Sequence, residues 1–93
     1  MKKIIEVEYV GIEDVQDIMD DVLALIREGH YASVQLSELL GDAHVIVYIM
    51  LGGFSDSKKF DYEFAFNITD YKRDVDTMNI CKHTLKNLLT GEE

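Results

Sequence analysis

The spacing of apolar residues changes twice along this chain, and that change limits the folds open to it. From Ile12 to Glu28 apolar residues recur every three or four positions, which is typical of an amphipathic helix. They then alternate with polar residues in three runs, a pattern typical of half-buried strands. Helical spacing returns from Tyr71 and ends at Gly91. The three alternating runs are residues 31–39, 44–51 and 60–68.

A further strand is expected from Lys3 to Val10, because its apolar residues alternate with Glu6 and Glu8. The chain has 93 residues, which suits a single domain spanning 1–93. These elements predict a two-layer α+β fold in the order β-α-β-β-β-α, with a mostly antiparallel sheet. Both helices are expected to pack on one face of the sheet, the face that carries the alternating aromatic residues of 60–68.

The charge balance limits the partners of the chain. Its 18 acidic and 9 basic residues give a formal net charge of −9, which disfavours direct binding to nucleic acid or to an anionic membrane. There is one cysteine, Cys81, and no run of 18 or more apolar residues. We therefore expect a cytoplasmic protein that binds basic partners.

Acidic residues gather on one predicted face of the 12–28 helix. Like charges three or four positions apart on a helix cost a few tenths of a kcal/mol each, so stability alone does not favour them. The simpler interpretation is a solvated face, and the functional one is a surface that occupies a basic groove of a partner. If the face works by mimicry, charge reversal at Asp14, Asp17 and Asp21 should leave the fold nearly intact and abolish partner binding. The candidate partner-binding acids are Glu6, Glu8, Glu13, Asp14, Asp17, Asp20 and Asp21.

The short, acidic, proline-free chain, with acids on the face from Glu13 to Asp21, resembles the small phage-encoded inhibitors of bacterial defence known as anti-CRISPR proteins. The resemblance lies in size, charge and architecture, without a shared motif. It implies a non-enzymatic inhibitor that mimics nucleic acid. It also implies a larger partner with a basic nucleic-acid-binding surface, such as a Cas nuclease. Most of the excess negative charge lies in the first half of the chain, so the mimicry is expected on one side.

The segment 52–59 combines two glycines with serines and lysines, but it lacks the order of a phosphate-binding loop. A plain loop between two strands is the favoured interpretation. Phe54 is expected at its exposed tip, as a further contact for a partner.

The remaining polar residues do not form a catalytic or metal-binding pattern. His30, His44 and His83 lack the spacing of a zinc site, and Cys81 lies within the apolar stripe of the last helix. We therefore expect no enzyme activity, no metal and no cofactor.

One alternative rests on the second face of the sheet, where Ile46, Tyr48 and Met50 are expected to be partly exposed. This face suits a homodimer, or a small oligomeric protein that sequesters a small anionic ligand with Lys58, Lys59 or His44.

Overall fold

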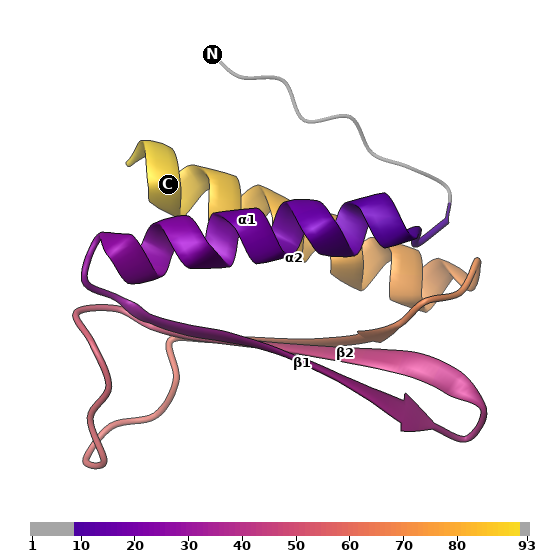
Figure 1. Ribbon diagram of the computed structural model, residues 1–93, viewed down its shortest axis with the longest axis horizontal. Coiled ribbons are helices and arrows are strands. Elements are labelled where there is room, and N and C mark those ends of the chain that lie inside the picture. Colours follow the sequence, from indigo (N-terminus) through magenta and orange to yellow (C-terminus); the bar gives the residue numbers. More distant parts are fainter. Residues whose placement is uncertain (1–8, 92–93) are drawn as a thin grey trace.

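The computed structural model describes residues 9–91, which fold as a layer of two helices on a three-stranded sheet (Figure 1). The expected α+β class is confirmed. The order in the described part is α-β-β-β-α, because the strand expected from Lys3 to Val10 lies outside it except for its last two residues, which are not in a strand. The elements are α1 (Ile12–Arg27), β1 (Tyr31–Leu39), β2 (Asp42–Met50), β3 (Tyr62–Asn67) and α2 (Lys72–Thr90).

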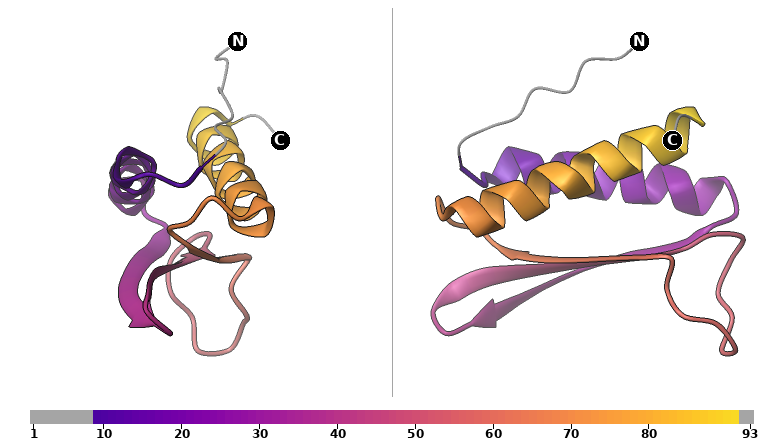
Figure 2. Two further views of the ribbon diagram at one scale, coloured as in Figure 1. Left: turned by 90° about the vertical axis from the view of Figure 1, so that its right-hand side faces the viewer. Right: turned by 180° about the vertical axis from the view of Figure 1, so that it is seen from behind.

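The sheet is antiparallel with the order β1-β2-β3, and both helices cover the same face of it (Figure 2). The hairpin between β1 and β2 turns at Leu40 and Gly41, whose φ angles are 53° and 92°. Positive φ at both central residues is the geometry of a type I′ turn, whose twist suits a two-residue hairpin. This turn sets the β1–β2 register, in which Tyr31 pairs with Met50 at the far end.

Side chains at alternate strand positions pack beneath the helices and form the core. Val45, Val47 and Ile49 of β2 are fully buried, because β2 is the central strand. The two helices contribute the other large group of buried apolar side chains: Val15, Ile18, Val22, Leu25, Val75, Met78, Cys81 and Leu85.

The aromatic alternation of 60–68 is only partly realised. Phe66 is buried under the helices and Phe64 packs at the edge of that core. Phe60 does not join them, because the strand begins only at Tyr62. The Phe60 ring instead lies 4.6 Å from that of Tyr48, on the other face of the sheet, so its predicted place among the helix-facing residues is wrong.

The start of α2 is held by a buried carboxylate rather than by a side-chain N-cap. The N-cap is Tyr71, which makes no side-chain capping bond. Asp74, in the first turn, accepts hydrogen bonds from the Asn67 backbone N–H (3.1 Å) and from the Thr69 hydroxyl (2.6 Å). This carboxylate therefore ties α2 to the end of β3.

The stop of α1 follows the sequence closely. The helix ends at Arg27, and Gly29 adopts a positive φ of 96°, the conformation that favours glycine after a helix. Among residues 9–91, neither helix has the length and apolar character needed to cross a membrane.

Candidate functional site

The acidic residues of α1 divide into an internal pair and an exposed row. Asp14 and Asp21 are buried between the helices, where Lys82 Nζ lies 2.8 Å from Asp14 Oδ1 and Lys86 Nζ lies 2.9 Å from Asp21 Oδ1. The expectation that both acids share a solvated face is therefore wrong. Their charges are neutralised within the fold.

The helical repeat explains this pairing. Asp14 and Asp21 are seven residues apart, and Lys82 and Lys86 are four apart, so each pair lies on one side of its helix. Where α1 packs against α2 these two sides meet. Asp14 has a second role, since its Oδ2 accepts a hydrogen bond from the Gly11 N–H (2.9 Å) at the start of α1. The spacing of the lysines was visible in the sequence, but which face of α1 they meet depends on helix packing.

The exposed row consists of Glu13, Asp17 and Asp20, and we call it the acidic row. Its members are four and three positions apart, so they follow one another along the solvent side of α1. Asp17 Oδ2 lies 3.8 Å from Lys82 Nζ, but its side chain is 60% exposed. Glu6 and Glu8 lie outside the described residues.

Phe54 is 61% exposed, as expected, and lies in the segment that joins β2 to β3. This segment, residues 51–61, projects from the sheet on the side opposite the helices (Figures 1 and 2). The acidic row lies on the helix layer. The structure therefore does not bring Phe54 and the acids together, and one flat contact cannot include both.

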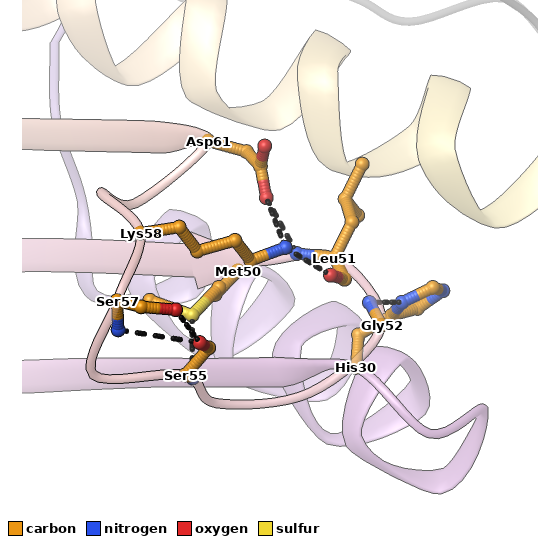
Figure 3. Close-up of polar contacts among 8 residues, drawn as sticks. All are labelled: His30, Met50, Leu51, Gly52, Ser55, Ser57, Lys58 and Asp61. Carbon is orange, nitrogen blue, oxygen red and sulfur yellow. Dashed lines mark hydrogen bonds and ion pairs between the residues drawn. The ribbon is translucent and has the colours of Figure 1, made fainter.

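Polar contacts give the loop a defined shape (Figure 3). Asp61 accepts a hydrogen bond from the Leu51 N–H at 2.7 Å, and Lys58 Nζ donates to the Leu51 carbonyl at 2.9 Å. His30 Nδ1 accepts from the Gly52 N–H at 3.0 Å, which attaches the loop to the connection between α1 and β1. Lys58 is therefore engaged in holding the loop.

An aromatic cluster supports the loop against the open face of the sheet. Ring centroids are 5.3 Å apart between Tyr31 and Phe54, and 5.9 Å between Tyr31 and Phe60. The Phe60 ring also contacts that of Tyr48 at a tilt of 31°, and Met50 beneath the cluster is only 2% exposed. The loop thus covers part of the face that the sequence suggested as a dimer surface.

A hollow of about 360 Å³ opens beside this cluster. Lys59 is the cation at its rim that makes no ion pair among the described residues, whereas Asp56 and Glu63 add negative charge. His44 lies six residues from Met50 along β2, about 20 Å away, and its Nδ1 contacts Asn67 Oδ1. The three side chains suggested for an anionic ligand, Lys58, Lys59 and His44, therefore do not converge. The residues lining the hollow are Met50, Phe54, Ser55, Asp56, Lys58, Lys59, Phe60 and Glu63.

The titratable side chains show no arrangement suited to a metal. Within residues 9–91 no group of three or more histidine, cysteine, aspartate or glutamate side chains is placed to hold a metal ion. Cys81 is fully buried, and burial, together with the nearby negative charge of Asp21, raises its pKa from 9.0 to about 12. A thiol with so high a pKa is a poor nucleophile at neutral pH.

Comparison with models of protein families, with curated proteins and with solved structures finds no match to this chain.

Proposed function

We propose that this chain is a non-enzymatic binding protein that places the acidic row of α1 on a basic surface of a larger protein. Where that surface normally holds nucleic acid, the chain acts as an inhibitor by competing for it. The proposal is supported by the exposure of Glu13, Asp17 and Asp20 on one side of one helix. The likeness of the chain to anti-CRISPR proteins makes a Cas nuclease the first partner to test.

The contrast with the internal acids supports a role in binding. Asp14 and Asp21 each have a lysine partner, so folding accounts for them. Glu13 and Asp20 have no cation within ion-pair distance among the described residues. Their neighbour Asp17 has only a distant one, since its Oδ2 lies 3.8 Å from Lys82 Nζ. Three like charges in succession slightly destabilise a helix. A basic partner removes that repulsion.

The size of the row limits the mimicry. From Glu13 to Asp20 the helix rises about 10 Å, which matches only a few phosphates of a nucleic acid strand. The chain therefore competes at one short stretch of a groove. Its affinity should fall steeply as salt is added, because the contact is exposed and electrostatic.

The test is a charge reversal of the whole row, Glu13→Lys, Asp17→Lys and Asp20→Lys, with DNA cleavage by a guide-loaded Cas nuclease as the readout. The parent should slow cleavage and the variant should not. A matched control changes three exposed acids elsewhere, Asp42, Asp56 and Asp70, to lysine, with the same change in net charge.

Inhibition that is lost equally in both triple variants would show that net charge, and not the acidic row, is responsible. The contrary result is a parent chain that inhibits none of the Cas nucleases tested and also fails to bind a polyarginine peptide at low salt. That result would refute the proposed binding to basic surfaces.

A second candidate function rests on the hollow beside the aromatic cluster. Its volume of about 360 Å³ and its lining by Phe54 and Phe60 suit one aromatic ring, and Lys59 suits an acidic group on that ring. The fluorescent probe anilinonaphthalene sulfonate has this chemistry. Binding should be lost with Phe54→Ala and Lys59→Glu, but kept with Lys72→Glu, which changes an exposed lysine on α2. Equal binding by all three variants would remove this candidate.

A further inference from the structure

The outer edge of β1 is long, almost uncharged and open. It runs for nine residues, and Glu38 is its single charged residue in a chain that is 29% charged. The Glu38 carboxylate accepts a hydrogen bond from the Gly41 N–H in the adjacent turn. Because β1 is an outer strand of the described sheet, its free side has no strand partner among residues 9–91. Such an edge is a template for pairing with another chain.

The hairpin shows which backbone groups face outward. Leu39 and Asp42 close a two-residue turn, so this pair exchanges both of its backbone hydrogen bonds within the hairpin. Alternation along β1 then turns the N–H and C=O groups of the even-numbered residues 32–38 toward the open side. These groups form a regular ladder without proline.

An apolar stripe of α1 lies directly above this edge. Met19, Leu23 and Ile26 are exposed at helical spacing, and they border a groove of about 300 Å³ whose floor includes Ala32 and Val34 of β1. Leu36, on the same side of β1, is 64% exposed. A ladder of free backbone groups and an apolar stripe therefore stand side by side.

We propose that a second copy of this chain pairs with this edge, β1 against β1, around a twofold axis at Gln35. The proposal is independent of the proposed function, because the acidic row points to solvent away from this edge. In this antiparallel register all nine residues of β1 have a partner, and every even-numbered residue meets another even-numbered one. The hydrogen-bonding groups of the two edges therefore match.

The side chains are complementary in the same register. Leu36 lies opposite Val34 of the second copy, on the side of the helices, so its exposed surface is covered. Ser33 lies opposite Ser37 of the second copy, and its buried hydroxyl, which has no hydrogen-bond partner among the described residues, gains a neighbour that can supply one. Glu38 lies opposite Ala32 of the second copy, so no two acids face each other.

Size and charge favour a second copy over a different partner. Nine paired residues extend about 30 Å along the strand, and a sheet with one layer of helices is about 20 Å thick. The contact at this edge would therefore bury on the order of 600 Å² of each copy. The total reaches the lower limit of a specific interface. A neutral edge lets two chains of net charge −9 meet where repulsion is weakest. Added salt should therefore tighten the dimer, whereas it should weaken binding to a basic partner.

A disulfide tests the register directly. Gln35 meets its own copy at the twofold axis as a pair without hydrogen bonds, with Cα atoms about 4.5 Å apart, so Gln35→Cys should form a disulfide-linked dimer on mild oxidation. Ser37→Cys is the matched control, since it is equally exposed on the same strand but its two copies lie about 14 Å apart. Cys81 is buried and should not interfere.

Sedimentation or light scattering of the full chain measures the dimer itself. Leu36→Lys should raise the dimer Kd at least about tenfold, while Ile80→Lys, at an equally exposed apolar position on α2, should leave it unchanged. A monomer at millimolar concentration would overturn the proposal. So would equal cross-linking by the two cysteine variants, or a dimer that is insensitive to Leu36→Lys.

Discussion

The two outer strands of the sheet, β1 and β3, differ in length and in how their backbone groups are satisfied. At the β3 edge the strand is six residues long, and the N–H of its last residue, Asn67, is bonded to the buried carboxylate of Asp74. At the β1 edge the strand is nine residues long and its outward groups have no partner among the described residues. We call the β3 side, where the end of the strand is bonded to α2, the closed flank, and the β1 side, where residues 9–91 supply no such bond, the open flank.

The same contrast holds for charge. On the closed flank, toward α2, the carboxylates of Asp14, Asp21 and Asp74 are buried with cations or hydrogen-bond donors. On the open flank, Met19, Leu23 and Ile26 are exposed. A buried carboxylate is tolerated only where its partners are in place, so it helps to specify one arrangement of α2 against α1 and β3. The exposed apolar stripe of α1 does not determine the packing of a single chain. It contributes to stability only when another surface covers it.

The largest effect is expected on the closed flank. Asp74→Ala removes the acceptor for the Asn67 N–H and the Thr69 hydroxyl, and leaving these donors unpaired should lower the free energy of unfolding by about 3 kcal/mol. Urea denaturation measures this, with Asp70→Ala, an exposed neighbour, as the control. A loss below about 1 kcal/mol would mean that the β3 edge does not depend on this carboxylate.

Two acids of the same helix should then behave differently. Asp14→Lys places a cation against Lys82 in a buried position and should cost about 3 kcal/mol, whereas Asp17→Lys on the exposed row should cost about 0.5 kcal/mol. A combined Asp14→Asn and Lys82→Met variant should recover part of the loss, because no unpaired charge remains. Equal costs for the two single reversals would contradict the division of the acids into internal and exposed groups.

The buried thiol of the closed flank gives a dependence on pH. Because the folded pKa of Cys81 is about 12 and the ordinary value is 9.0, the unfolded chain loses this proton first. Its contribution to stability is therefore complete below pH 9 and is lost as the pH rises toward 12, at up to about 1.4 kcal/mol per pH unit. Cys81→Ala should lower stability at pH 7 but flatten the decline above pH 9. If the stability of Cys81→Ala declines as steeply above pH 9 as that of the parent, the decline comes from groups other than Cys81.

Much of the fold could be predicted from local spacing. The bounds of α1 and β1 follow from apolar periodicity and from Gly29, because these signals lie within the elements themselves. The position of Phe60 could not be predicted in this way. Phe60 continues the alternation of β3 in the sequence, but β3 begins only at Tyr62. The Phe60 side chain instead packs against the rings of Tyr31 and Tyr48 on the other face of the sheet.

The candidate site was harder to predict, because exposure depends on packing between elements. Asp14 and Asp17 look alike in the sequence, and only the approach of Lys82 from a helix 68 residues away makes one of them internal. Periodicity identifies the apolar side of a helix. It does not show how far round that helix its neighbour extends.

The smallest effect is expected at the turn that ends the open edge. Leu40 is 94% exposed and has a φ of 53°, so its side chain makes little packing contact and its backbone is strained. Asparagine favours this conformation and precedes glycine in type I′ turns, so Leu40→Asn should raise the free energy of unfolding by about 0.5–1 kcal/mol. The measurement must be made at a concentration where the chain is monomeric, with Leu39→Asn, which lies in the strand, as a destabilising control.

Because residue 40 lies beyond the nine paired positions of β1, the dimer Kd should stay the same. A gain in monomer stability with a weaker dimer would place Leu40 inside the contact and shift the twofold axis away from Gln35.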